Sequence, residues 1–185
     1  KPHVQKFIEL TKPKNEKYIE GDWYHTLLVN TSELRNSHKV TSFYIDLSGL
    51  SYEGVEYLME FMKDFKSGFR LSTMLTGGRV NEIGRNETAY VHRGSLYMLY
   101  IVVNLNKDNY ETRLKNLEKF SRIFQKNYTT YESYQNIIDK ELDNWQCRYY
   151  GENFGKLVEI KQKYDPINLF NWKQSIPTNT EILCY

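Results

Sequence analysis

The 185-residue sequence predicts an α+β fold in which helices pack on one face of an antiparallel sheet. Residues 39–47 alternate apolar and polar side chains, as a strand with one buried face does. Residues 108–127 repeat apolar side chains at helical spacing, which predicts an amphipathic helix. Short connections join the predicted strands, and such connections favour antiparallel pairing.

The first half of the chain predicts strands around one helix. Residues 22–34 are strand-like and then turn. Residues 51–65 predict a helix that Ser51 can cap, with an inward stripe of Val55, Leu58, Met62 and Phe65. Gly68 ends this helix, and residues 69–78 predict a strand that closes on a glycine pair.

Residues 88–105 carry the strongest strand signal in the sequence. Gly94 predicts either a hairpin turn or a bulge inside this segment. Side chains alternate between the two faces of a strand. After Gly94, one predicted face therefore holds Met98, Tyr100 and Val102, and the other holds Leu99, Ile101 and Val103.

Two further helices are predicted. Residues 108–127 begin at the N-cap Asp108, and one face of this helix carries Tyr110, Leu114, Leu117, Ser121 and Phe124. Residues 152–164 place on one side Phe154, Leu157, Val158, Lys161 and Tyr164. Asp165-Pro166 ends this helix, because a residue before proline is pushed out of the α region.

Charge and hydropathy exclude two classes of partner. The chain has 25 Lys and Arg against 23 Asp and Glu, and the two signs are interspersed, which argues against a nucleic-acid partner. No apolar run approaches the ~20 residues of a membrane span, so we expect no membrane partner. Residues 9–17 predict a solvated loop, and the opening "KPHVQKF" suggests a piece of a longer protein.

Cysteine and sequon usage predicts little on its own. Cys147 and Cys184 fit no zinc or redox spacing, so the default is a free buried thiol for Cys147 and an inert Cys184. Sequons begin at Asn30, Asn86 and Asn127, where about two are expected by chance. They permit a secretory route without demonstrating one.

The sequence contains none of the phosphate-binding, hydrolase or metalloprotease motifs. Its four histidines are scattered, and no metal site is predicted. His92 is interpreted as a surface or hairpin residue, because its neighbours Arg93-Gly94 fit a turn.

The C-terminal third carries a long ordered pattern of specific residues, followed by Gln-Ser-Ile-Pro. Its members are Tyr149, Tyr150, Gly151, Asn153, Phe154, Leu157, Lys161, Tyr164, Asp165, Pro166, Asn168, Phe170 and Gln174 to Pro177. This pattern resembles the C-terminal segment of the berberine-bridge-enzyme-like flavoproteins. The stretches at 77–83 and 92–100 resemble that family's GG-x-x-x-E-I turn and H-R-x-G-x-L-Y hairpin, so the resemblance covers roughly residues 39–177.

The resemblance implies an FAD-dependent oxidoreductase that transfers hydride from an alcohol, sugar, alkaloid or phenolic substrate to flavin N5. It implies that residues 1–130 form a substrate-binding α+β domain and that residues 131–185 form a C-terminal segment. That segment would dock on an N-terminal FAD-binding domain, which this chain does not contain, through "YYGENF" and a return anchored by Asn168 and Phe170. It also implies a secreted protein, and a chain that alone binds no flavin tightly.

The resemblance also implies the site. Tyr134 and Asn136 match the family's flavin-facing Y-x-N and would contact the cofactor. Ile137 stands where the family commonly has a Tyr base, and isoleucine cannot exchange a proton. Met98, Tyr100 and Ile137 would line the substrate pocket.

Three interpretations of the proton acceptor stay open. Tyr100 can act as a displaced base, which requires a nearby cation that Met98 does not supply, or it can be a pocket wall. The base can come from the FAD domain. Alternatively, the chain belongs to a non-catalytic relative that keeps the fold without the base.

Overall fold

The computed structural model describes residues 2–12, 22, 38–63, 69–104, 110–180, 182 and 184. The chain forms two compact units, residues 1–35 and 36–185. In the first unit, helix α1 covers Pro2–Thr11, so the predicted loop at 9–17 is wrong at its start. The strand predicted at 22–34 lies, except for Asp22, outside the described residues.

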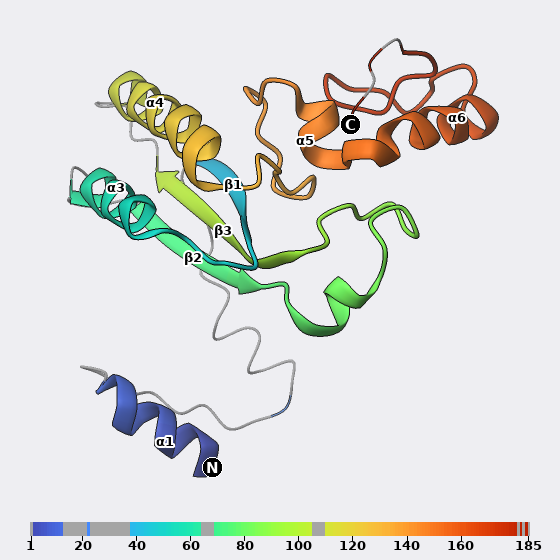
Figure 1. The fold of residues 1–185 in the computed structure, drawn as a ribbon. Coiled ribbons are helices and arrows are strands. Elements are labelled where there is room, and N and C mark those ends of the chain that lie inside the picture. The colour runs from blue at the N-terminus through green and yellow to red at the C-terminus, as the bar shows by residue number, and fades with distance from the viewer. Residues whose placement is uncertain are drawn as a thin grey trace. The chain divides into compact units, whose positions relative to one another are not determined.

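The described part of the second unit contains a three-stranded antiparallel sheet (Figure 1). Its strands are β1 (His38–Asp46), β2 (Phe69–Leu75) and β3 (Ser95–Asn104). The spatial order is β1-β3-β2, so β3 pairs with both neighbours. The predicted α+β class and the antiparallel pairing are confirmed.

Helices α3 (Tyr52–Lys63) and α4 (Tyr110–Tyr128) pack together on one face of this sheet (Figure 1). The buried core between them and the strands consists of Phe43, Leu58, Leu99, Ile101, Val103, Leu117, Phe120 and Phe124. Helices therefore cover one face, as predicted. Burial of this apolar surface supplies the main stabilisation of the unit.

The helix α3 begins as predicted but presents a different stripe to the core. The Oγ of Ser51 accepts the N–H of Gly54 at 3.1 Å, which confirms the cap. Val55 is 42% exposed, so its predicted inward position is wrong. Tyr57 and Phe61 point inward instead, because both rings stack on Phe120, at centroid distances of 5.4 and 3.9 Å.

The helix α4 buries Leu117 and Phe124 as predicted. Phe120, which the predicted stripe omitted, is also buried, whereas Tyr110 at the first turn is exposed. The proposed cap Asp108 lies outside the described residues. The stripe turned out wider than expected because α4 contacts both the sheet and α3.

Two strand predictions are wrong in part. The strand β1 buries Thr41 to Ile45 on both faces rather than on one. Residues 88–94 form no strand, and Gly94, at φ +78°, lies just before β3 instead of turning a hairpin. Arg93 holds this irregular segment through bonds to the carbonyls of Val80 at 2.7 Å and Tyr90 at 3.2 Å. These bonds replace the ladder partners that a hairpin would supply.

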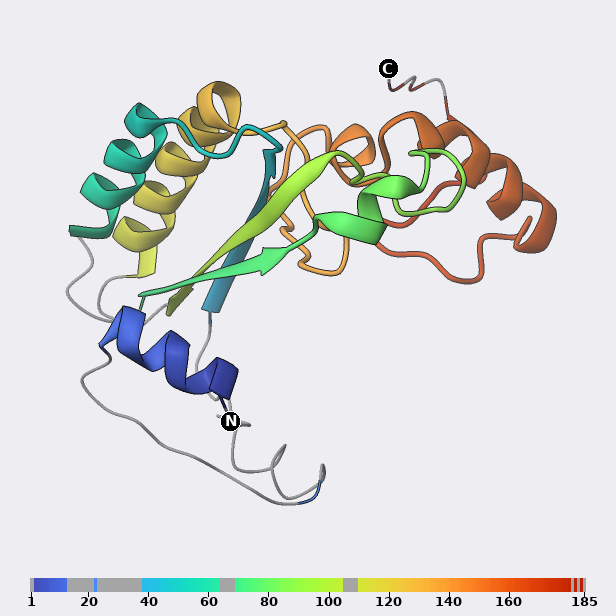
Figure 2. The same ribbon diagram turned by 60° about the horizontal axis from the view of Figure 1, so that its bottom comes forward.

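The C-terminal segment adds a short helix α5 (Trp145–Tyr150), a 3₁₀ turn η3 (Gly151–Asn153) and helix α6 (Phe154–Tyr164). The end of α6 at Asp165 confirms the prediction, whereas α5 was not predicted. Figure 2 shows these elements near the end of the sheet where β2 ends and β3 begins. The domain boundary expected after residue 130 stays a prediction.

Cys147 and Cys184 form a disulfide, so the prediction of two unpaired cysteines is wrong. Their Cα atoms lie 5.1 Å apart, within the range that a disulfide spans. The separation of 37 residues carries no motif signal, because the pairing depends on the tail folding back to α5.

Candidate functional site

The stretch from Ser133 to Ile137 lies against β1. The backbone N–H of Tyr134 donates to the Oγ of Ser42 at 2.8 Å, and the Oγ of Ser133 donates to the carbonyl of Ser42 at 3.1 Å. The N–H of Ile137 donates to the carbonyl of Tyr134 at 2.9 Å, which closes a tight turn. The three residues of this stretch that were predicted to face a flavin or its substrate, Tyr134, Asn136 and Ile137, therefore lie in one turn that is hydrogen-bonded to the sheet.

The two strand residues of the predicted site lie on the same side. Ser42 is the register partner of Tyr100, and Tyr44 is the register partner of Met98. Register partners share a face, so these four side chains lie on the face opposite α3 and α4. The structure thus brings Tyr134 next to the pair of Met98 and Tyr100 through Ser42.

Exposure differs among the predicted site residues. Asn136 is exposed, and its side-chain amide donates to the Oη of Tyr134 at 2.9 Å. Tyr134, Ile137 and Tyr100 are half-buried, and Met98 is buried. The Asn136 amide and the Tyr134 phenol form one polar unit at the open end of the turn, where hydrogen bonding to a ligand is available.

Two further tyrosines near the turn are poor proton acceptors. Burial, with the hydroxyl contact to Tyr90 at 3.1 Å, raises the pKa of Tyr44 far above its usual value. Burial also raises the pKa of Tyr90. Both phenols stay protonated at neutral pH.

His92 was interpreted as a surface or hairpin residue, and this is wrong, because its side chain is fully buried. The imidazole stacks on Tyr44 at 4.2 Å between centroids and meets Tyr90 and Tyr134 edge-on at 5.1 and 6.4 Å. Sequence reasoning missed it because the contacts come from segments about 40 residues apart. The available signal was its place in the H-R-G stretch, next to a strand.

An ion-pair network continues from His92 toward the C-terminal segment. Nδ1 of His92 lies 2.9 Å from Glu132, and Arg85 bridges Glu132 at 2.8 Å and Glu152 at 2.7 Å. The hydrogen bond to Glu152 raises the pKa of Arg85, and the same contact lowers the pKa of Glu152. Arg85 therefore stays paired with Glu152 across the neutral range, and through Glu132 the network links the turn to η3.

Residues 133–177 match the family described as "Berberine and berberine like". Tetrahydroberberine oxidase of Argemone mexicana is 33% identical over 165 residues, which cover 75% of this chain and 29% of the relative. This chain belongs to the berberine-bridge-enzyme-like family. Berberine-bridge-enzyme-like proteins also include the solved Physcomitrella patens BBE-like 1, which is 30% identical with a TM-score of 0.74. That match covers 84% of this chain and 33% of that one.

The name of a bacterial relative includes the cofactor FAD. The Bacillus subtilis protein "Uncharacterized FAD-linked oxidoreductase YvdP" is 36% identical over 102 residues, which cover 55% of this chain and 22% of the relative. The chain therefore spans about a third or less of the length of the relatives that it matches.

The berberine-bridge-like "YYGENF" residues pack inside this chain. Tyr149, Asn153 and Phe154 are buried. The Nδ2 of Asn153 donates to the carbonyls of Arg85 at 2.8 Å and Thr88 at 3.1 Å. These contacts favour the expected structural role, because they hold the loop before β3, and the expected docking on an FAD-binding domain stays a prediction.

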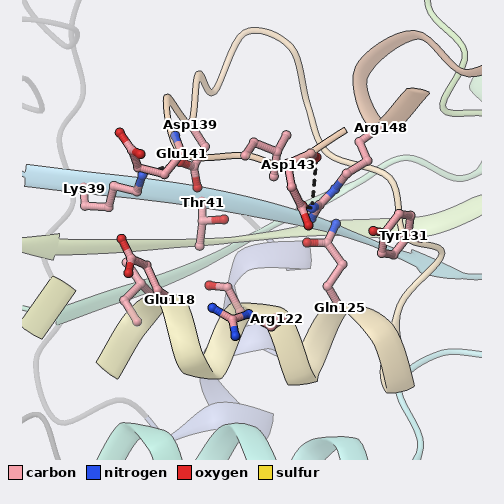
Figure 3. A pocket seen from close by; sticks show the side chains of 13 residues that line it. Lys39, Thr41, Glu118, Arg122, Gln125, Tyr131, Asp139, Glu141, Asp143 and Arg148 are labelled. Carbon is pink, nitrogen blue, oxygen red and sulfur yellow. Dashed lines mark hydrogen bonds and ion pairs between the residues drawn. The ribbon is translucent and has the colours of Figure 1, made fainter. Parts of the chain in front are cut away.

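A polar pocket of about 310 Å³ lies between β1, α4 and the segment from Tyr131 to Arg148 (Figure 3). Lys39 and Thr41 line it from β1, and they alternate with Ser42 along the strand. Arg148 lies buried in its wall, paired with Asp143, and burial lowers the pKa of Arg148. The pocket is therefore on the helix side of β1, and Gln125 in its wall donates to the Oγ of Ser133, where the turn begins, at 3.1 Å.

Among the residues that the structure describes, no group of three His, Cys, Asp or Glu side chains is placed to hold a metal ion. No helix within the described ranges is long and apolar enough to cross a membrane.

Proposed function

We propose that this chain covers the flavin and binds the substrate in an FAD-dependent oxidoreductase. One observation supports this most strongly. The Tyr134–Asn136 turn is hydrogen-bonded to Ser42, and Ser42 lies on the sheet face that carries Met98 and Tyr100, opposite the helices. The substrate class is a small alcohol, sugar, alkaloid or phenolic. An aromatic wall formed by Tyr100 and Tyr134 suits stacking on such rings.

The residues on this face fit a flat redox cofactor. A strand presents alternate side chains toward one side, which gives a planar ring an even surface. Asn136 offers an exposed amide for hydrogen bonding, while Met98 and Tyr44 keep the neighbouring surface dry. When bound, FAD supplies the acceptor for hydride; the protein supplies binding, orientation and exclusion of water.

The partner that completes this arrangement is an FAD-binding domain of the same protein. The loop after α6 supports this, because it exposes large apolar side chains: Ile167, Leu169, Phe170 and Trp172. Asp165 holds the loop by accepting the N–H groups of Leu169 at 2.7 Å and Phe170 at 3.0 Å. An ordered loop with an apolar surface is typical of a docking contact.

Tyr100 serves in this proposal as a wall of the substrate pocket rather than as the base. Its register partners, Ser42 on β1 and Ser72 on β2, are uncharged, and Arg70, a cation of β2 on the same face, is exposed and lies opposite Val102 rather than Tyr100. The test is Tyr100→Phe in the full-length protein, followed by stopped-flow flavin reduction. We expect a change in substrate affinity and a reduction rate within about threefold of wild type; a loss of ~1,000-fold, as for a missing general base, would make Tyr100 the base.

The second candidate function is a non-catalytic relative, favoured by Ile137 and Met98 at positions where the family has a base and a cation. Purified full-length protein incubated with a panel of alcohols, sugars and phenolics separates the two. Bleaching of the flavin absorption by any member supports the oxidoreductase. Bound flavin that no member bleaches supports the non-catalytic relative.

We also propose that the protein enters the secretory pathway. The disulfide of Cys147 with Cys184 suits an oxidising compartment, and the sequon residues Asn86 and Asn127 are exposed. Expression in a eukaryotic secretory host, followed by enzymatic removal of N-glycans, tests this. A mass unchanged by that treatment, together with reduced cysteines, would refute it.

A further inference from the structure

The imidazole of His92 is a buried polar group that the proposed function leaves without a role. Its Nδ1 lies 2.9 Å from the Oε2 of Glu132, and its Nε2 lies 3.2 Å from the side-chain amide of Gln135. Gln135 stands between Tyr134 and Asn136 in the chain. One buried ring thus contacts the flavin-facing turn both before Tyr134 and at its centre.

The ring is itself held by the sheet. It stacks on Tyr44 with an interplanar angle of 15°, and the edge of Tyr90 closes one side at 83°. Tyr44 belongs to β1 and is the register partner of Met98. His92 therefore connects the turn to Tyr44, which lies beside the strand residues of the same proposed site.

The contacts of His92 do not depend on its charge. Glu132 only accepts hydrogen bonds, so Nδ1 carries a proton. The amide of Gln135 has a donor and an acceptor end, so it pairs with Nε2 whether or not that nitrogen is protonated. Arg85 fixes Glu132 from the other side at 2.8 Å. The link from Glu132 through His92 to Gln135 is complete in either state.

We propose that His92 is a positioning residue, which fixes Gln135 and so sets where Tyr134 and Asn136 stand against the flavin. This inference rests on the proposed function. His92 acts through Gln135 and exchanges no proton with the substrate. Its removal therefore alters the surroundings of the flavin as well as the rate, and a purely structural role would change neither.

The experiment compares matched variants of the full-length holoprotein. Gln135→Leu removes the contact with Nε2. His92→Phe keeps a ring on Tyr44 and loses both hydrogen bonds. Tyr90→Phe is the control, since it breaks the hydroxyl contact with Tyr44 in the same cluster and leaves Gln135 untouched. The readouts are the visible flavin spectrum, the flavin reduction potential and the rate of flavin reduction.

We expect Gln135→Leu and His92→Phe to shift the spectrum and potential and to slow reduction about tenfold, the loss of roughly one hydrogen bond. Tyr90→Phe keeps wild-type values. The double variant His92→Phe/Gln135→Leu is no worse than either single one, because both remove the same link.

Two results would overturn the inference: additive effects in the double variant, or wild-type spectra and potentials in both Gln135→Leu and His92→Phe. If His92→Phe does not fold, Gln135→Leu decides alone, compared with Tyr90→Phe. A wild-type protein without flavin refutes the proposed function before any variant is compared, so the two failures are distinct.

Discussion

The two faces of the three-stranded sheet are built differently. The face toward α3 and α4 is apolar, and its rings contact one another, such as Phe43 with Phe124 at 5.2 Å between centroids. The opposite face carries Ser42, Tyr44 and Tyr100 and is contacted by the turn from residue 134 through hydrogen bonds. The helix side is covered by apolar side chains of α3 and α4. The other side presents polar and aromatic groups, which in our proposal bind the ligand.

This difference separates stability from function. Contacts on the helix side are non-directional, so their loss is felt as free energy of unfolding. Contacts on the open side are directional bonds between distant segments, such as Ser42 with Tyr134, which fix positions more than they add stability. Substitutions on the helix side should therefore lower the free energy of unfolding, whereas substitutions on the open side should change the reaction with little loss of stability.

Phe43→Ala is the largest expected effect, and it tests the helix side. Phe43 is fully buried and contacts Phe120 and Phe124 edge-on. We expect a loss of about 3–5 kcal/mol in the free energy of unfolding, measured by denaturant titration of the full-length protein. Leu75→Ala is the control, because Leu75 is 82% exposed, and it costs less than about 1 kcal/mol. Similar losses in both variants would contradict the comparison.

Phe170→Ser tests whether the loop after α6 is covered by a second domain. Phe170 is 76% exposed within this chain. If the FAD-binding domain covers it, the substitution lowers the free energy of unfolding of the full-length protein by about 2 kcal/mol. Tyr52→Ser, at a residue 73% exposed on α3, is the matched control and changes stability by about 0.5 kcal/mol or less. Equal, small changes would count against the docking loop.

The helix side was largely predictable from the sequence, because its signals are local. Alternation placed β1, helical spacing placed α4, and Asp165-Pro166 placed the end of α6. Errors arose where tertiary contacts chose among apolar residues. Tyr57 replaced Val55 in the α3 stripe because the ring of Phe120 lies opposite it.

The open side was predictable only through resemblance to a family. No periodicity indicates that His92 stacks on Tyr44, since the two residues are 48 positions apart. The pairing of Cys147 with Cys184 was missed for the same reason, because it depends on the path of the tail. Motif residues identified the turn at Tyr134, but its attachment to Ser42 required the folded chain.

Tyr44→Phe tests a buried tyrosine of the open side through the pH dependence of the unfolding free energy. The pKa of Tyr44 is raised by burial and by Tyr90, so the unfolded chain loses this proton first, near pH ~10. The stabilisation is present below that pH and is lost as the pH rises toward the folded-state pKa. The variant costs about 1 kcal/mol at neutral pH through the lost hydroxyl contact, and its unfolding free energy falls less steeply above pH ~10. Parallel alkaline curves for the two proteins would show that Tyr44 is not the group responsible.

Asn136→Ala has the smallest expected effect on stability and so isolates the open side. Asn136 is exposed, and its one described side-chain bond is to the Oη of Tyr134 at 2.9 Å. We expect a change in unfolding free energy of about 0.5 kcal/mol or less, because exposed substitutions cost little. If this amide contacts the flavin as proposed, its removal slows flavin reduction about tenfold. Lys140→Ala, at an exposed residue of the next turn, is the control for both measurements. A variant that loses stability but keeps the wild-type reduction rate would place Asn136 with the structural residues, and the open face would then carry one fewer functional group than proposed.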